Sequence, residues 1–456
     1  MDRKLGILNV GISILSRVIL LVSALFVRRL LIRCIGNEVN GLNSLYSSII
    51  GMLTVAELGV GNAIVFSMYR PIVAGDKRRV AALYCLYKKL YRIIGAVIFV
   101  AGLLVIPFLP YLVSDYESVN VNVYVTFLLT LVAVVLTYMY SAKTSLIVAH
   151  KNNYITTSIM TIARLIEYVL QAAAIYILRS YVAYLVCHII ETLIVWGLTE
   201  GAVRRLHGEI IVMNESVDPG TKSEIVRNIK AMFMHKIGTI LVNSIDSMII
   251  SVFVGVVALG KYSNYALIAS VMSGTLSLFF SPLTSIVGHL CAKGDSQRIK
   301  KYFQRFYNLN YILGTIFFLG YYVFVDEAVA ICFEGGLKIS RSVVFIITLN
   351  QFIQFMRHAA LLFRDASGAF YYDRWKPVAE GVVNLTLSLI FVKTFPADYR
   401  VVGVIAATII TNLLICHIVE PYVLFKHVLK ESCWGFYVKN YALIALFVSV
   451  LLWSPS

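Results

Sequence analysis

The feature of this sequence that most restricts its fold is a series of apolar stretches long enough to cross a lipid bilayer. A helix of about 20 apolar residues spans the hydrocarbon core, and only helices and closed barrels satisfy their backbone hydrogen bonds there. We therefore expect an all-α polytopic membrane protein with about twelve transmembrane helices. The twelve stretches lie at 7–27, 42–66, 93–112, 123–148, 155–178, 181–201, 231–254, 262–287, 307–330, 342–363, 377–395 and 401–424.

Composition agrees with a membrane protein and excludes two other classes. Of the 456 residues 59% are hydrophobic and 14% charged, whereas soluble domains have about 45 to 50% and about 25%. A soluble enzyme and a disordered chain are both excluded. The first stretch is not a cleavable signal peptide, because it exceeds an h-region in length, contains Arg17 and is followed by Arg28-Arg29.

The net charge of +16 is explained by topology. With the N-terminus inside, 28 Lys and Arg residues fall in inner segments, 9 in outer segments, and Arg17, Arg164 and Arg357 within spans. The positive-inside rule then places the N-terminus in the cytoplasm, and no nucleic-acid partner is needed. We expect a multi-pass protein of the bacterial plasma membrane.

No motif for covalent chemistry is visible. The seven cysteines are scattered without C-x-x-C spacing, which predicts structural thiols with neither a disulfide framework nor a metal site. A phosphate-cradling G-x-x-x-x-G-K and a nucleophile elbow are also missing from the sequence. We therefore expect a protein that is not an enzyme and needs no cofactor. Tyrosines such as Tyr84, Tyr87 and Tyr91 are expected to form interfacial belts.

The chain contains an internal repeat at an offset of 219 residues. Residues 35–48 align without gaps on 254–267, and 75–95 align on 294–314, with 10 identities in 35 positions, about three times the chance level. Six spans per half make both halves enter the membrane in the same direction. Such parallel repeats occur in secondary transporters, which place the substrate between the halves and work by alternating access.

The repeat divides the chain into four parts. We expect a six-helix lobe at 1–201, a cytoplasmic linker at 202–230, a second six-helix lobe at 231–424, and a C-terminal part at 425–456. In that last part, the thirteen apolar residues of 441–453 are too few to span comfortably. They predict an incomplete thirteenth helix or a tilted interfacial segment.

Two basic residues lie at repeat-equivalent positions inside the predicted spans. Arg17 maps onto Lys236 at the 219 offset. A charge within a span costs several kcal/mol unless it faces a partner or a water-filled cavity. We predict that both cations approach a central cavity and attract an anion such as a diphosphate. In the alternative, Lys236 ends the inner loop and Arg17 pairs with a carboxylate.

Further polar residues could extend this cationic cavity. Arg28 lies three turns after Arg17 on nearly the same helix face, although it could instead snorkel to outer lipid phosphates. Asn350, Gln354 and Arg357 form one stripe in the tenth span. This stripe suits a hydroxyl-rich glycan and phosphate, but also ordinary hydrogen bonding between helices.

Three carboxylates in spans could couple transport to a cation or pair with a base. Glu57 and Asp246 are open to both interpretations, and Arg17 or Arg357 could be the basic partner. Glycines flank Glu57, so this residue could also serve in helix packing and capping. Glu167 lies at i, i+3 from Arg164, and Glu191 at the same spacing from His188, which favours an ion pair within each helix.

The glycine and polar pattern resembles a known transporter family. The residues that carry this resemblance are Ile35-Gly36-Asn37-Glu38, Gly41-Leu42, Glu57-Leu58-Gly59-Val60-Gly61-Asn62-Ala63-Ile64, Gly75-Asp76, Asp246 to Ile250, Gly255, Gly260-Lys261-Tyr262-Ser263, Asn384, Gly403 and Thr408 to Asn412. The pattern is similar to that of bacterial polysaccharide repeat-unit flippases. These proteins belong to the multidrug, oligosaccharidyl-lipid and polysaccharide exporter superfamily. Ser16-Arg17-Val18 also resembles the first helix of the related lipid II flippases, which bears a cavity arginine.

This resemblance implies two six-helix lobes that move an undecaprenyl-diphosphate-linked oligosaccharide from the inner to the outer leaflet. Its partners would be the anionic lipid-linked glycan, membrane lipids, and a polysaccharide polymerase and glycosyltransferases. One alternative is a cation-coupled drug or metabolite antiporter of the same superfamily, which would need an acidic cavity. Another is a multipass membrane glycosyltransferase or acyltransferase, for which His207 and Glu209 in the longest loop form no recognisable arrangement.

Overall fold

The computed structural model describes residues 2–57, 60–114, 119–218, 244–280, 296–333, 335–367 and 375–453, with isolated positions between these ranges. Within these residues the chain is nearly all helical and has no β-strand. It forms two compact units, Met1–Lys236 (unit 1) and Ile237–Ser456 (unit 2). Each unit is described separately below.

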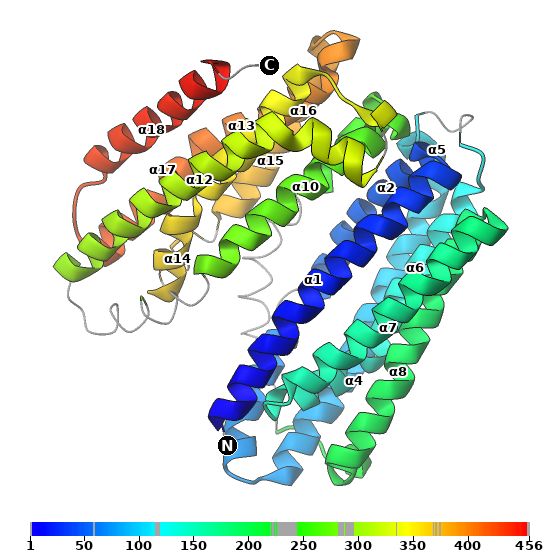
Figure 1. The fold of residues 1–456 in the computed structure, drawn as a ribbon. Helices are drawn as coiled ribbons and strands as arrows, with labels where there is room; N and C mark the ends of the chain where they lie inside the picture. Colours follow the sequence, from blue (N-terminus) through cyan, green and yellow to red (C-terminus); the bar gives the residue numbers. More distant parts are fainter. Residues whose placement is uncertain are drawn as a thin grey trace. The chain divides into compact units, whose positions relative to one another are not determined.

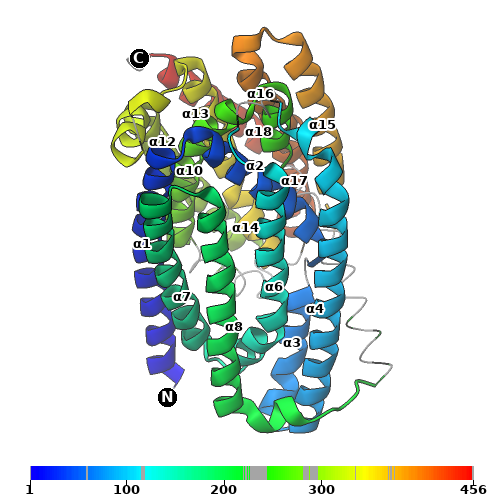
Figure 2. The same ribbon diagram turned by 90° about the vertical axis from the view of Figure 1, so that its right-hand side faces the viewer.

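Unit 1 consists of long helices that run side by side (Figures 1 and 2). In it α6 packs against α4 and α8, and α7 packs against α1 and α8. The elements are α1 (Asp2–Cys34), α2 (Asn37–Leu53), the 3-10 turn η1 (Thr54–Glu57), α3 (Val60–Val73), α4 (Lys77–Val105), η2 (Ile106–Phe108), α5 (Leu109–Leu112), α6 (Val123–Ala149), α7 (Asn153–Ala173), the π-helix η4 (Ala174–Leu178) and α8 (Tyr181–Val212).

Unit 2 repeats this plan and adds one helix. Its α13 packs against α12 and α16, and α15 packs against α16. The elements are helix Ser244–Phe253, α10 (Val256–Phe280), α12 (Ser296–Cys332), η5 (Gly335–Leu337), α13 (Arg341–Met356), α14 (His358–Ala366), α15 (Lys376–Thr394), η7 (Ala397–Tyr399), α16 (Arg400–Thr411), the π-helix η8 (Asn412–Cys416), α17 (His417–Leu424), the π-helix η9 (Phe425–Leu429) and α18 (Trp434–Trp453).

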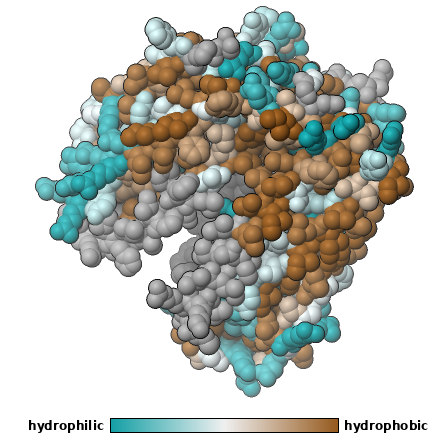
Figure 3. All heavy atoms as spheres, in the orientation of Figure 1, coloured by the Kyte–Doolittle hydropathy of each residue, from teal (hydrophilic) through white to brown (hydrophobic). Residues whose placement is uncertain are grey.

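The helices are those of a multi-pass membrane protein, as the sequence predicts. Among the described residues, eight helical segments are long and apolar enough to cross a bilayer. Figure 3 shows a broad hydrophobic surface along unit 1, with hydrophilic residues at its lower end. Side chains such as Leu104 and Val169 are about two-thirds exposed there, which suits contact with lipid tails.

Five predicted spans are not continuous α-helices within the described residues: the third ends in η2 and α5, the fifth ends in the π-helix η4, and three others are broken within their length. The second span is divided into α2, η1 and α3 around Glu57, and the tenth is interrupted at Arg357 between α13 and α14. The twelfth contains η8. Broken and π-distorted helices leave backbone groups and polar side chains in unusual positions, often at functional sites. Apolar periodicity cannot reveal such breaks, because the residues on both sides remain apolar.

The thirteenth helix is longer than the sequence predicts, so the prediction that it is incomplete is wrong. Helix α18 has 20 residues and begins at Trp434, seven positions before the apolar run. Two polar residues in its first turns are satisfied by α12. Lys439 Nζ donates to Asn308 Oδ1 at 2.6 Å, and the buried Asn440 Oδ1 accepts from Tyr307 Oη at 2.7 Å. These contacts let the helix extend beyond its apolar part.

The internal repeat is visible in the backbone. Helices α2 and α10 begin at Asn37 and Val256, α4 and α12 at Lys77 and Ser296, and α8 and α16 at Tyr181 and Arg400, so each pair is separated by 219 residues. The residues before α2 and α10 are Gly36 and Gly255, with φ angles of 130° and 118°. Their N–H groups donate to Leu31 O and Ile250 O, which are also 219 residues apart.

These two glycines provide a test of the repeat. At Gly36 the backbone occupies a region open mainly to glycine, and an added Cβ would lie 2.1 Å from Glu38 Oε2. We expect Gly36→Ala and Gly255→Ala each to lower the free energy of unfolding by about 1–3 kcal/mol, measured by thermal or denaturant unfolding in detergent. Gly201→Ala is the control, because nothing lies within 4 Å of its added Cβ. If all three variants had the same free energy of unfolding, the backbone at Gly36 and Gly255 would not require glycine.

Candidate functional site

The predicted site residues fall into separate groups. Arg17 and Arg28 lie on α1, Glu57 ends η1, and Glu167 lies on α7. In unit 2, Asn350 and Gln354 lie on α13 and Arg357 directly after it. Asp246 lies on helix Ser244–Phe253. Lys236 lies outside the described residues.

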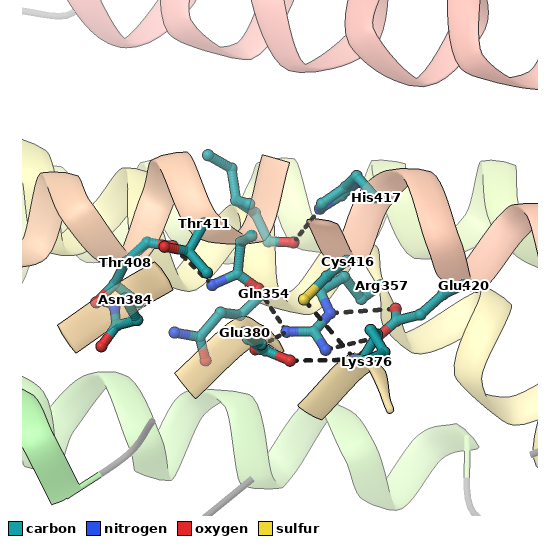
Figure 4. A network of polar contacts seen from close by, with 12 residues as sticks. Gln354, Arg357, Lys376, Glu380, Asn384, Thr408, Thr411, Cys416, His417 and Glu420 are labelled. Atoms are coloured by element: carbon teal, nitrogen blue, oxygen red, sulfur yellow. Dashed lines mark hydrogen bonds and ion pairs between the residues drawn. The ribbon is translucent and has the colours of Figure 1, made fainter. Parts of the chain in front are cut away.

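The largest polar group in unit 2 is built around Arg357 (Figure 4). Its guanidinium donates to both carboxylate oxygens of Glu420, at 2.6 and 3.2 Å, and lies 3.5 Å from Glu380 Oε1. Lys376 Nζ donates to Glu420 and lies 3.2 Å from Glu380 Oε2. We call these four residues the Arg357 cluster. The two cations balance the two carboxylates, and all four side chains are at most 14% exposed.

Irregular backbone positions this cluster. Arg357 stands at the junction of α13 and α14, and Lys376 begins α15, one turn before Glu380. The π-helix η8 supplies Asn412, whose Oδ1 accepts from Arg357 Nη1, and Cys416, 3.7 Å from Lys376 Nζ. The helix break and the π-helix thus bring the cluster together from three segments of the chain.

The cluster changes the interpretation of Arg357. Its guanidinium is already bound by carboxylates, so an anion could bind only in competition with Glu420 and Glu380. Asn350 and Gln354 lie one turn apart as predicted, and Gln354 Nε2 donates to Asn350 Oδ1 at 3.2 Å. The polar stripe is therefore largely satisfied within unit 2.

Three members of the Arg357 cluster were not predicted. Lys376 was counted as a loop charge, and Glu380 and Glu420 were not singled out among the residues of the last two predicted spans. Both carboxylates lie within apolar stretches, where every charge needs a partner. That rule could have predicted that these carboxylates pair with Arg357. It could not have predicted the geometry of the pairing, because the sequence gives no sign of the π-helix.

Asp246 occupies a second polar site in unit 2. Both of its carboxylate oxygens accept from Thr408 Oγ1, at 2.9 and 3.1 Å, and Asn384 Nδ2 donates to the same hydroxyl at 2.7 Å. Within the described residues Asn384 Oδ1 and Ser388 Oγ are buried without a hydrogen-bond partner. Arg357 pairs with Glu420 and not with Asp246, so that predicted ion pair is wrong.

Glu57 occupies a polar site in unit 1, at the break between α2 and α3. Its carboxylate accepts from Tyr138 Oη at 2.8 Å and from Tyr91 Oη at 3.3 Å. Among the described residues of unit 1, no ion pair links Glu57 to Arg17. Tyr84, Tyr87 and Tyr91 are at most 3% exposed. The predicted interfacial belt is therefore wrong for these three residues, because all are buried, and Tyr91 and its hydrogen-bond partner Tyr87 lie beside Glu57.

The second polar site of unit 1 joins α7 and α8. Arg164 Nη1 donates to Glu167 Oε2 at 2.7 Å, as the sequence predicts, and Arg164 Nη2 lies 3.6 Å from Glu191 Oε1. His188 Nδ1 lies 2.9 Å from Glu167 Oε1 and 3.9 Å from Glu191 Oε2. The two predicted pairs therefore form a single group, which we call the Arg164 cluster. The ligand atoms of Glu167, His188 and Glu191 all lie within 4.8 Å of one another.

Arg17 differs from the other charges within predicted spans. It stands midway along the 33 residues of α1, about 22 Å from either end. Its side chain is exposed, and none of the ion pairs found among the described residues includes it. Arg28, three turns later, is only partly exposed and lies near Tyr184 of α8. Arg17 is thus a cation midway along a helix that the sequence predicts to span the bilayer, where it would need a polar environment.

Comparison with known proteins shows the fold. No family model matches the sequence, and no match is found among curated proteins. Solved structures match over the whole chain. An inward-facing multidrug resistance MATE family transporter of the MOP superfamily has a TM-score of 0.67 at 11% identity, covering 97% of this chain and 98% of the other.

Two further structures broaden the comparison. The lipid II flippase MurJ in its inward closed conformation has a TM-score of 0.64 at 11% identity, covering 98% of each chain. A MOP superfamily transporter from Pyrococcus furiosus has a TM-score of 0.55 at 13% identity, covering 96% of this chain and 94% of the other. The chain thus has the fold of MOP-superfamily transporters, and at these identities the likeness shows the fold alone.

The Arg357 cluster predicts strong energetic coupling. Arg357→Gln leaves Glu420 with Lys376 alone, and breaking a buried ion pair costs about 3–5 kcal/mol. In the double variant Arg357→Gln/Glu420→Gln, Lys376 still faces Glu380. The free energy of unfolding lost by the double variant should therefore be smaller than the sum of the two single-variant losses by about 0.5–3 kcal/mol. Denaturant unfolding of the single and double variants measures this difference.

The control is the exposed pair Lys77–Glu209. Its Gln variants should show a coupling of at most about 1 kcal/mol. Additive losses at Arg357 and Glu420 would show that the two side chains do not stabilise unit 2 as a pair.

Proposed function

We propose that this protein is a flippase that moves an undecaprenyl-diphosphate-linked oligosaccharide from the inner to the outer leaflet by alternating access. The observation that carries the proposal is Arg17, a cation midway along α1 with no ion pair among the described residues. A cation in this position favours an anionic ligand in a water-filled cavity. The fold shared with MOP-superfamily transporters, including a lipid II flippase, supports the proposal.

Lys236 and Arg28 complete the proposed anion site. Lys236 is the repeat-equivalent of Arg17, and two cations suit the two negative charges of a diphosphate. Arg357, Gln354 and Asn350 take part only if the diphosphate displaces Glu420 or Glu380 from Arg357. We therefore rank these three residues behind Arg17, Lys236 and Arg28.

Asp246 is the proposed site of a coupling cation. Its carboxylate, the Thr408 hydroxyl and the unpaired Asn384 Oδ1 offer oxygen ligands of the kind that hard cations prefer. We extend this proposed set to Ser388, whose buried Oγ is unpaired among the described residues and which follows Asn384 by one turn of α15. A bound monovalent cation such as Na⁺ would also offset the cost of a single carboxylate inside the membrane.

The proposed anion site is tested by charge removal. We expect Arg17→Ala and Lys236→Ala each to abolish glycan export, because the diphosphate loses a counter-charge while the protein still inserts. The measurement is the leaflet distribution of the lipid-linked glycan in cells depleted of the wild-type protein. Arg29→Ala, an exposed arginine later on α1, is the control and should export normally. Full export by both variants would refute the site.

The proposed coupling site is tested separately. We expect Asp246→Asn and Ser388→Ala to reduce Na⁺-stimulated transport in proteoliposomes, with the larger loss for Asp246→Asn because it removes the charged ligand. Ser449→Ala is the control, since its exposed hydroxyl donates only to Ala445 O of its own helix. Unchanged Na⁺ stimulation in Asp246→Asn would exclude this site.

A further inference from the structure

We infer that unit 1 binds a phosphate ester in a pocket at the end where α4 begins and α8 ends (Figure 1). The pocket has a volume of about 480 Å³, within the range of about 300–1,000 Å³ that is usual for small-molecule sites. Its walls are the turn between α3 and α4, the end of α6 and the last turns of α8. The inference goes beyond the proposed function, because the pocket includes none of Arg17, Arg28 and Lys236.

Three permanent cations line the pocket, and one of them is available to a ligand. Lys77 Nζ lies 2.5 Å from Glu209 Oε2, and Arg204 Nε lies 2.6 Å from Glu200 Oε1. Arg205 is exposed and forms no ion pair among the described residues. An anion can therefore bind Arg205 without displacing a carboxylate. A guanidinium suits phosphate, because its planar fork donates to two phosphate oxygens at once.

The two carboxylates that line the pocket are already engaged. Asp76 caps α4, since its Oδ1 accepts from the Arg79 N–H at 2.9 Å, and Glu209 is bound to Lys77. The N-terminus of the 29-residue α4 adds partial positive charge to the same end of the unit. With three cations against two engaged carboxylates, the pocket favours an anionic ligand.

A break in α8 gives the pocket a second polar feature. The backbone of His207 is non-helical, with φ of −140° and ψ of 30°, and its ring lies against that of His150 with centroids 4.0 Å apart. His150 Nδ1 lies 2.9 Å from Leu146 O and donates to it, because a carbonyl only accepts. His207 Nε2 is buried without a hydrogen-bond partner among the described residues. Such an atom is costly to leave unpaired, so it points to a ligand oxygen.

The remaining wall residues favour an ester over a bare anion. Pro71, Ile72, Val80, Leu206 and Ile210 offer apolar surface to the carbon part of a ligand. A soluble phosphate ester and a lipid headgroup both combine a phosphate with such a carbon part.

A metal ion is the competing ligand for the two imidazoles. Two nitrogens are fewer than the three protein ligands that even an open zinc site uses. The nearby carboxylates, Asp76 and Glu209, are engaged elsewhere, and Lys77, Arg204 and Arg205 would repel a cation. The pocket therefore suits a phosphate better than a metal.

The test uses two pairs of probes on the purified full-length protein in detergent. Glycerol 3-phosphate is compared with glycerol by isothermal titration calorimetry, and phosphatidic acid is compared with diacylglycerol by native mass spectrometry. Each pair differs only in the phosphate. We expect a phosphate probe to bind and its partner not to bind. Binding of glycerol 3-phosphate would identify a soluble ligand, and binding of phosphatidic acid alone would identify a lipid headgroup.

Variants assign the binding to the pocket. Arg205→Gln should weaken it about tenfold or more, because a charge-assisted hydrogen bond is lost. His207→Phe keeps a ring against His150 but removes Nε2, and should also weaken it. Glu209→Gln should strengthen binding, because it releases Lys77 and removes a negative charge. Arg92→Gln is the control, since this exposed arginine of α4 lies outside the pocket and its loss changes the net charge equally.

Three results would overturn the proposal. The first is that neither phosphate probe binds. The second is that glycerol or diacylglycerol binds as tightly as its phosphate partner. The third is that Arg92→Gln weakens binding as much as Arg205→Gln, which would indicate general charge attraction. The lipid-linked glycan takes no part in these measurements, so their failure would leave the flippase proposal standing, and failure of glycan export would leave the pocket standing.

Discussion

The cost of placing charge inside a bilayer determines how the interior of this protein is arranged. Each ionisable side chain there needs a partner, a bound ion or water. The Arg357 cluster meets this requirement with two cations and two carboxylates. Among the described residues the other sites meet it less completely: the hydrogen bonds of Asp246 and Glu57 come from hydroxyl groups, and the Arg164 cluster has one guanidinium for two carboxylates. Unbalanced sites are where ions can bind.

The repeat preserves backbone geometry while the polar chemistry differs. Gly36 and Gly255 share a conformation that requires glycine, and helix starts recur at the 219 offset. The charges do not follow this symmetry. Tyr138, which donates to Glu57, is equivalent to Arg357, and Glu57 itself is equivalent to the buried Leu276. Two similar frames therefore carry different polar sites.

The sequence was sufficient to predict the helical membrane fold and the repeat, because length and apolarity of the spans follow directly from bilayer thickness. It also predicted the pairing of Arg164 with Glu167, a local i, i+3 contact. It did not predict how His188 joins that pair or how Glu420 reaches Arg357. These contacts depend on packing between helices, and at Arg357 also on a helix break and a π-helix. The full length of α18 was missed because Lys439 and Asn440 are satisfied only in the folded unit.

The neighbours of each carboxylate indicate which ion it can hold. Beside Asp246, Asn384 donates to the Thr408 hydroxyl, and its own Oδ1 is unpaired among the described residues, an oxygen of the kind that hard cations prefer. Around Glu57 the carboxylate accepts from two tyrosine hydroxyls among the described residues, so both of these donors are neutral groups. A histidine accompanies both groups of ion pairs: His188 lies in the Arg164 cluster, and His417 lies beside Arg357 and Glu420 (Figure 4). The same bilayer constraint is thus met by ion pairs around Arg357 in unit 2 and by tyrosine hydroxyls around Glu57 in unit 1.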